Sequence, residues 1–297
     1  MSSVLITGTS AGIGLATALT VARAGHTVYA TMRNPARSPE LAETAAKERL
    51  PIRISTMDVN SDSSVKERME AIYREAKHLD VLVNNAGVVG SGSVEEVSLA
   101  KARAVMETNY FGALRCIQAV VPDMRQRRGG CIINITSAAG KIANSPSGCY
   151  AASKFALEAI SEALAQEMIS FHVRVAIVEP GIIDTAMARR IEKPTGTEVY
   201  PQQRRFADLF TASLKNPGKP SVVADKVLEI IDSGTMQLRH PVGPDSEPLL
   251  AWRRSMSDEE WVALHGASDD VWYSRLQRDF GMEIRPRIEA QDTRAGG

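Results

Sequence analysis

Short apolar runs alternate with longer segments of helical periodicity along this chain, and that alternation limits the folds open to it. The apolar runs cover residues 3–7, 26–31, 52–57, 81–83, 131–136, 173–178 and 236–240. Most are continuously apolar, which is typical of strands buried on both faces, and parallel strands alternate with helices. We therefore predict an α/β fold: a Rossmann-type, doubly wound parallel sheet of about seven strands with helices on both faces. The helical segments lie at 15–24, 38–49, 61–77, 100–127, from 147 onward and at 221–231.

Polar residues follow the predicted strands at the points where they end. In order they are the glycine-rich segment 8–14, Arg33, Asp58, the segment 84–87 and Ser137. Ligands of open parallel sheets bind outside the carboxyl ends of the strands. The agreement among these positions predicts one ligand site at that edge.

The glycine-rich segment after the first strand has the spacing Gly8-x3-Gly12-Ile13-Gly14. It differs from the commoner Gly-x-Gly-x-x-Gly, but it also joins a strand to a helix. Glycines allow the backbone to approach a ligand closely, and the helix N-terminus offers unpaired N–H groups to a phosphate. The segment therefore predicts binding of a dinucleotide cofactor.

The end of the second strand indicates which dinucleotide is bound. A carboxylate there would bond the ribose 2′-hydroxyl of NAD. The chain instead reads Met32-Arg33-Asn34. A guanidinium pairs with a 2′-phosphate, so Arg33 favours NADP(H) over NAD(H). A solvated arginine at a strand end is the alternative.

Tyr150 and Lys154 lie four residues apart in a predicted helix that starts near Ser147, so they share one face of it. A tyrosine normally has a pKa of about 10. A neighbouring ammonium and the positive end of the helix dipole favour the tyrosinate and would lower that pKa. The pair could then exchange a proton with a substrate hydroxyl near neutral pH. By itself, this spacing is far more typical of an ordinary surface pair.

Asn109 interrupts an apolar stretch of the predicted helix 100–127. A buried amide needs hydrogen-bond partners. From the residues alone, a structural amide and a functional one fit equally well. Pro122 is expected to end or kink this helix at its last turn.

The second half of the chain is less regular. Residues 186–220 show a looser pattern with two arginine pairs, Arg189-Arg190 and Arg204-Arg205. We interpret this stretch as a substrate-binding lid. We expect residues 1–244 to form the dinucleotide-binding catalytic domain. The extension 245–297 contains all three tryptophans and packs on that domain, with fraying from about residue 285.

Composition excludes several classes of protein. Lys plus Arg and Asp plus Glu both number 35, so charge gives no support to a nucleic-acid partner. No run of 18 apolar residues suggests a membrane span, and the N-terminus has no signal-peptide pattern. Three scattered cysteines suggest neither a disulfide framework nor a metal site. We expect a cytoplasmic protein, and the small residues Ala152, Ala156, Ala159 and Ala163 favour a homodimer or homotetramer.

Taken together, the motifs resemble those of the short-chain dehydrogenases/reductases over roughly residues 3–243. They also resemble the branch with 17β-hydroxysteroid and retinol dehydrogenase-like members. The resemblance rests on the following segments: Thr7-Gly8-x3-Gly12-Ile13-Gly14, Asp58-Val59, Asn84-Asn85-Ala86-Gly87, Asn109, Ser137, Tyr150-x3-Lys154 and Pro180-Gly181-x3-Thr185.

The resemblance implies a role for each motif. Tyr150 would be the general acid/base, Lys154 would hold the nicotinamide ribose and lower the tyrosine pKa, and Ser137 would bond the substrate oxygen. Asn109 would hold a water that extends a proton relay from Lys154. The implied cofactor contacts are Gly8, Ser10, Gly12, Ile13, Gly14, Arg33, Asp58, Val59, Asn84, Asn85, Ala86, Gly87, Tyr150, Lys154, Pro180, Gly181, Ile183 and Thr185.

These observations predict an NADP(H)-dependent oxidoreductase that interconverts a secondary alcohol and a ketone, or a primary alcohol and an aldehyde. The hydrophobic lid and extension suggest an apolar substrate of steroid, retinoid or aromatic type. A reductase of polar or carrier-bound 3-oxoacyl substrates is an alternative, because the two arginine pairs could form a docking patch. A non-catalytic NADP(H)-binding regulator is a second alternative.

Overall fold

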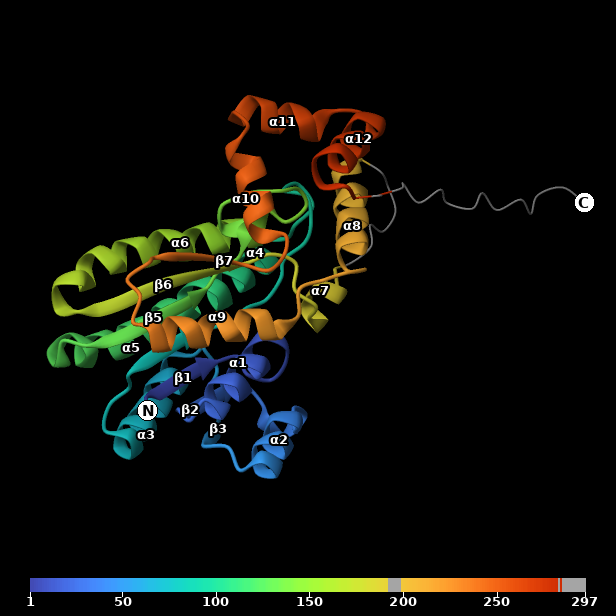
Figure 1. Ribbon diagram of the computed structural model, residues 1–297. Helices are drawn as coiled ribbons and strands as arrows, with labels where there is room; N and C mark the ends of the chain where they lie inside the picture. Colours follow the sequence, from blue (N-terminus) through green and yellow to red (C-terminus); the bar gives the residue numbers. More distant parts are fainter. Residues whose placement is uncertain (192–198, 283, 285–297) are drawn as a thin grey trace, which may run out of the picture.

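A computed structural model describes residues 1–191, 199–282 and 284. Seven strands form one parallel sheet in the order β3-β2-β1-β4-β5-β6-β7, with helices on both faces (Figure 1). This is the predicted Rossmann-type, doubly wound arrangement. The strands are β1 (Ser3–Thr7), β2 (Thr27–Met32), β3 (Ile52–Thr56), β4 (Val81–Asn84), β5 (Gly130–Ile135), β6 (Val173–Pro180) and β7 (Arg239–Val242).

Continuous burial of the strands divides the core into two layers. In β1, Val4 and Ile6 belong to the apolar cluster on one face, and Leu5 belongs to the cluster on the other. Three helices cover the first face: α1 (Gly12–Arg23), α2 (Glu40–Glu48) and α9 (Pro220–Ser233). The second face is covered by α3 (Asp62–Ala76), α5 (Gly112–Arg127) and α6 (Gly148–Met168). Short 3-10 turns lie at η1 (Pro35–Arg37), η3 (Ala138–Gly140) and η4 (Ile169–Phe171).

The long helix predicted over 100–127 is broken in its middle. It consists of α4 (Leu99–Met106), a π-helical segment η2 (Glu107–Phe111) and α5. Asn109 lies in this π segment, and such local distortions occur often at functional sites. Pro122 neither ends nor divides α5, which continues to Arg127. The prediction that this proline ends the helix is wrong, because α5 runs on past it for more than a turn, and a kink there stays a prediction.

The last strand is displaced from its predicted position. We expected residues 236–240, but β7 begins at Arg239. Its parallel pairing with Ile177–Pro180 of β6 sets this register, and Pro241 lies within it. A proline is tolerated there because β7 is an edge strand.

The predicted irregular stretch contains more helix than expected. It holds α7 (Ala186–Arg189) and the 13-residue α8 (Pro201–Ser213). Three further helices follow β7: α10 (Ser246–Arg254), α11 (Asp258–Gly266) and α12 (Asp269–Phe280). Figure 1 shows α8 and α10–α12 gathered at one end of the sheet. The predicted fraying from residue 285 lies outside the described residues.

The small-residue positions on α6 lie on its outer side. Ala152, Ala159 and Ala163 are exposed in the single chain. The expected homo-oligomer stays a prediction. Among the residues that the structure describes, no helix is long and apolar enough to span a membrane.

Candidate active site

The glycine-rich turn lies between the end of β1 and the start of α1. Gly8 and Gly12 have φ values of +71° and +58°, which L side chains rarely adopt. A Cβ at Gly14 would lie 2.3 Å from the carbonyl oxygen of Gly8, so only glycine fits there. Ala11, the residue before α1, provides no side-chain cap for the helix. The first N–H groups of α1 are therefore available to a phosphate.

The segment after β4 supports this turn. The side-chain amide of Asn85 donates hydrogen bonds to the carbonyl oxygens of Thr7 (2.9 Å) and Gly8 (3.0 Å). The Thr7 hydroxyl accepts hydrogen bonds from the backbone N–H groups of Asn85 and Ala86, both at 3.0 Å. Gly8 also lies against Ala86, because an added Cβ would be 2.7 Å from the Ala86 Cα. The two segments predicted to bind the cofactor thus form one rigid unit.

The side chain of Asn84 is turned into the protein. It is 4% exposed and donates to Asn134 at 2.8 Å, and Asn134 in turn donates to Ser161 on α6. This chain of amides links β4, β5 and α6. Because the Asn84 side chain is buried and bonded to Asn134, we expect a cofactor to contact this residue only through its backbone.

Four further predicted cofactor contacts occupy different surroundings. Arg33 is exposed just beyond β2, and Ser10 is exposed in the glycine-rich turn. Asp58 is partly buried and accepts a hydrogen bond from the backbone N–H of Asn60 at 3.0 Å. Val59 is buried against Gly112 of α5, where an added Cβ would lie 2.8 Å from it.

Asn109 clamps the chain that follows β4. Its carbonyl oxygen accepts from the Val88 N–H at 2.8 Å, and its amide donates to the Val88 carbonyl and to Ser153, both at 2.9 Å. A Cβ at Gly87 would lie 3.4 Å from this oxygen and 3.8 Å from Lys154 Nζ. Asn109 and Lys154 therefore meet at Gly87, and the Asn109 side chain already makes structural bonds.

Ser137 and Tyr150 are joined by a side-chain hydrogen bond. Ser137 directly follows β5, and Tyr150 lies in the first turn of α6. Ser137 Oγ also lies 3.3 Å from the Pro180 carbonyl and accepts from the Ala139 N–H at 3.1 Å. The sheet edge thus brings the predicted acid/base beside the predicted oxygen-binding hydroxyl.

The pKa of Tyr150 moves in the direction opposite to the one expected. Burial raises the pKa of the phenol, and the hydrogen bond from Ser137 lowers it by less. The i,i+4 spacing suggested a lowered pKa through Lys154. Desolvation of the phenolate outweighs that effect in the ligand-free chain.

Lys154 is 5% exposed and donates to the Ile135 carbonyl at 2.9 Å. Its Nζ lies 5.7 Å from the centre of the Tyr150 ring. Burial lowers the pKa of the Lys154 ammonium to about 8, while the Glu158 carboxylate acts in the opposite direction. Lys154 therefore remains charged at neutral pH and close to its titration midpoint in mildly alkaline solution.

A largely apolar cavity of about 210 Å³ opens beside Ser137 and Tyr150. The cofactor-side wall includes Ile13, Pro180, Gly181, Ile183 and Thr185. The opposite wall comes from α8 and the C-terminal helices and includes Phe206, Leu209, Phe210, Leu249, Trp252, Trp261, Trp272 and Leu276. The predicted lid and the extension therefore line one cavity.

Sequence reasoning missed the part that individual extension residues play in this wall. Trp261 packs with Ala138 and Ile142, the residues that follow Ser137. Its indole N–H donates to the Ala143 carbonyl at 3.3 Å. The concentration of all three tryptophans in the extension was the one sequence signal of this arrangement.

Asp245 was also missed. Its carboxylate accepts hydrogen bonds from the Ile182 N–H at 2.9 and 3.2 Å, and a Cβ at Gly181 would lie 2.1 Å from it. Asp245 thus fixes the segment Pro180–Thr185. Thr185 caps α7, and its methyl group would lie 3.1 Å from a Cβ added at Gly12.

Residues 2–196 match the family model described as short chain dehydrogenase. The chain belongs to the short-chain dehydrogenase family. This confirms the family resemblance that the motifs suggested.

Relatives of this short-chain dehydrogenase cover nearly its whole length. A 3-ketodihydrosphingosine reductase of Bacteroides thetaiotaomicron is 36% identical over 261 residues, covering 85% of this chain and 91% of that protein. Retinol dehydrogenase 8 of Bos taurus is 36% identical over 264 residues, covering 84% of each. The crystal structure of a short-chain dehydrogenase from Streptomyces avermitilis matches with a TM-score of 0.77 at 27% identity, over 94% of this chain and 98% of that one.

The residues present fit the nicotinamide dinucleotide of this family. The glycine positions at the start of α1 leave no room for side chains, and the helix N-terminus lacks a side-chain cap. Together they form a backbone cradle that suits a pyrophosphate. The Pro180–Thr185 segment faces the same cavity as Tyr150, where a nicotinamide could be held.

Three of the four arginines in the two pairs form ion pairs within the protein. Arg205 is 3% exposed, pairs with Asp269 at 2.7 Å and donates to the carbonyls of His265 and Ala267. Arg204 pairs with the same carboxylate. Arg189 forms an ion pair with Asp184 at 2.5 Å. Most of this charge is therefore balanced within the protein.

Proposed function

We propose that this short-chain dehydrogenase is an NADP(H)-dependent oxidoreductase that interconverts an apolar secondary alcohol and a ketone, or a primary alcohol and an aldehyde. The observation that carries the proposal is the hydrogen-bonded pair Ser137–Tyr150 in the wall of a largely apolar cavity. Family membership supports the redox chemistry, and the position of these two hydroxyls in the cavity wall supports its location.

The proposed chemistry needs a proton at the substrate oxygen. When bound, the nicotinamide supplies or accepts the hydride. In the reductive direction the carbonyl oxygen becomes an alkoxide, and Tyr150 donates a proton to it. Ser137 holds the same oxygen through its hydroxyl, which stabilises the developing charge. In the oxidative direction Tyr150 takes the proton from the alcohol.

Lys154 and Asn109 would serve this proton transfer from the protein side. The Lys154 ammonium lies 5.7 Å from the Tyr150 ring and would bind the nicotinamide ribose while it offsets the cost of a tyrosinate. Asn109 fixes the Val88 backbone beside Lys154 and would hold the relay water through its remaining polar groups. Its amide group is already engaged, so the relay role falls to its backbone.

The cofactor preference rests on Arg33. It lies exposed beyond β2, next to the glycine-rich turn, where no carboxylate takes its place. A guanidinium in this position would bind a 2′-phosphate and stack on an adenine.

Two observations favour an apolar substrate. The cavity wall opposite the cofactor side includes all three tryptophans and two phenylalanines. The relatives named as a 3-ketodihydrosphingosine reductase and a retinol dehydrogenase act, by their names, on long apolar molecules. The carrier-bound 3-oxoacyl alternative is less well supported, because Arg204 and Arg205 are paired with Asp269.

A screen of NADPH oxidation tests the proposal. The panel contains 2-decanone, all-trans-retinal, estrone, acetophenone and a 3-oxoacyl thioester, each with NADPH and with NADH. We expect turnover of at least one apolar carbonyl, with NADPH preferred. Turnover of the thioester alone would support the alternative. NADPH binding without turnover of any carbonyl would support the regulator.

A further inference from the structure

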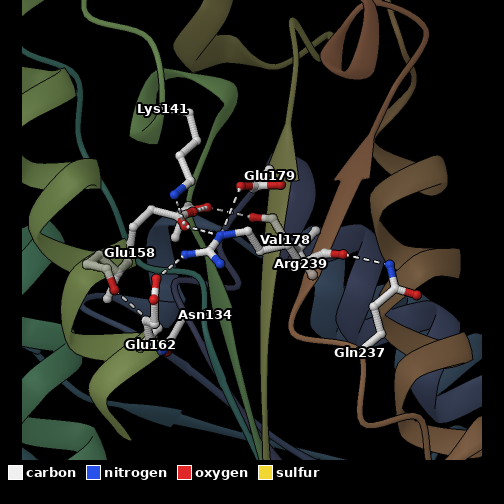
Figure 2. A network of polar contacts seen from close by, with 11 residues as sticks. Asn134, Lys141, Glu158, Glu162, Val178, Glu179, Gln237 and Arg239 are labelled. Atoms are coloured by element: carbon white, nitrogen blue, oxygen red, sulfur yellow. Dashed lines mark hydrogen bonds and ion pairs between the residues drawn. The ribbon is translucent and has the colours of Figure 1, made fainter. Parts of the chain in front are cut away.

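A buried cluster of charged side chains lies directly beneath the turn that carries Ser137. Glu158 of α6 and Glu179 of β6 are 3% and 2% exposed. Arg239 of β7 lies between them, with its Nε 3.2 Å from Glu158 and 3.8 Å from Glu179 (Figure 2). Buried charge is costly unless it is paired, so a cluster of this kind calls for an explanation.

Glu158 contacts the chain on both sides of Ser137. Before the serine, its carboxylate accepts a hydrogen bond from the Thr136 hydroxyl at 2.7 Å. After the serine, a Cβ at Gly140 would lie 2.9 Å from Glu158 Cγ, and the Lys141 ammonium lies 3.8 Å from the carboxylate. The turn η3 is thus held at its start and at its end by one side chain.

Glu158 also lies one helical turn after Lys154 on the same face of α6. Its charge favours the ammonium form of Lys154 and opposes the effect of burial on the pKa of that group. One buried carboxylate, which is not among the residues that line the cavity, therefore acts on both Ser137 and Lys154.

We propose that Glu158 is a positioning residue of this enzyme, which holds Ser137 through Thr136 and the η3 turn and keeps Lys154 charged. This inference rests on the proposed function. The positive charges of Arg239 and Lys141 lie beside the Glu158 carboxylate, at 3.2 and 3.8 Å. Glu179 is the second buried carboxyl of the cluster. Burial and the neighbouring Glu158 raise the pKa of Glu179 to about 7.

Glu162 provides a matched control. It lies one turn beyond Glu158 on α6 and contacts the same Arg239, at 2.6 Å. Its side chain is half exposed, and its carboxylate accepts a hydrogen bond from Arg239 and none from Thr136 among the described residues. Removal of its charge tests the loss of an Arg239 partner without disturbing the support of that turn. Glu247 of α10, another charged group that acts on Glu179, is left unchanged.

The test compares Glu158→Gln with Glu162→Gln in the full chain, with NADPH and the best apolar carbonyl of the screen. We expect Glu158→Gln to reduce kcat about tenfold or more, since small misplacements of reacting groups are costly. The dissociation constant of NADPH, followed by its fluorescence, should change less than kcat. The alkaline decline of kcat should move to lower pH. Glu162→Gln should leave kcat and its pH profile unchanged.

A second pair of variants separates positioning from folding. Thr136→Val removes the hydroxyl that Glu158 holds, and Thr136→Ser retains it. We expect Thr136→Val to lower kcat and Thr136→Ser to restore most of it, at similar melting temperatures. Equal kcat values for Glu158→Gln and Glu162→Gln, or for Thr136→Val and Thr136→Ser, would overturn the positioning role. Failure of the proposed function is distinguishable, because then the unaltered chain would not turn over any carbonyl.

Discussion

The indole N–H of Trp261 donates a hydrogen bond to the Ala143 carbonyl, 3.3 Å away, and so joins two segments 118 residues apart. Ala143 lies between Ser137 and Tyr150 in the chain, and Trp261 lines the cavity beside them. The C-terminal extension is therefore tied to the loop between two predicted catalytic residues. It forms part of the cavity wall.

The first prediction concerns this wall. Trp261→Ala removes a large apolar surface from the cavity and one hydrogen bond, each a loss of about 1 kcal/mol or more. We expect KM for apolar carbonyls to rise about tenfold or more while NADPH binding is retained. Val262→Ala is the control, because Val262 is the next residue in the chain and is 69% exposed. Unchanged KM for Trp261→Ala would exclude Trp261 from substrate binding.

Tyr150→Phe tests the proposed acid/base. It removes the phenolic oxygen that hydrogen-bonds Ser137 and leaves the ring in place. We expect kcat to fall by roughly 10²- to 10⁴-fold, the usual contribution of general acid–base catalysis. NADPH binding should persist, since the glycine-rich turn is untouched. Substantial turnover by this variant would refute the role of Tyr150.

Arg33→Ala tests the cofactor preference. Loss of a charged hydrogen bond to a phosphate costs about 1.5–3 kcal/mol, so the dissociation constant of NADPH should rise about 10- to 100-fold. That of NADH should change little. Arg37→Ala is a suitable control, because Arg37 is also exposed and lies four residues further along. Equal weakening of NADPH and NADH would contradict a phosphate contact.

Much of this architecture could be predicted because it depends on local patterns. Continuous apolar runs identify buried parallel strands, and such strands bring their following residues to one edge. Ser137 and Tyr150 meet there although they belong to different elements. The strands β1–β6 were predicted to within two residues for the same reason.

The features that sequence did not reveal depend on contacts between distant segments. The register of β7 is set by β6, and its polar residues Arg239 and His240 give no apolar pattern. Burial reversed the expected pKa shift of Tyr150, and residue spacing carries no information about burial. The hydrogen bond from Thr136, directly after β5, to Glu158 of α6 joins two distant segments, and neither of these two residues belongs to the motifs above.

Glu179 provides the last prediction, which concerns stability and pH. Burial raises the pKa of the Glu179 carboxyl to about 7, whereas the unfolded chain would have a value near ~4.3. Between these two pH values, Glu179 binds a proton in the folded state that it has released in the unfolded chain. The free energy of unfolding must therefore fall as pH rises from about 4.5 to about 7, by at most about 1.4 kcal/mol per pH unit from this group. Above pH 7 its contribution is constant.

Glu179→Gln replaces the protonated acid with a neutral side chain of the same size. The difference in unfolding free energy between this variant and the unaltered chain should grow in favour of the variant from pH 5 to pH 7 and then level off. Urea titrations at half-unit pH intervals measure it. Glu162→Gln is the control: Arg239 lowers the pKa of Glu162, so the stability that its charge contributes is lost only as pH falls below about 4.5, and the effect of this substitution should be constant from pH 5 to pH 7. A pH-independent difference for Glu179→Gln between pH 5 and pH 7 would show that Glu179 is already ionised there and that the charge in this cluster is distributed differently.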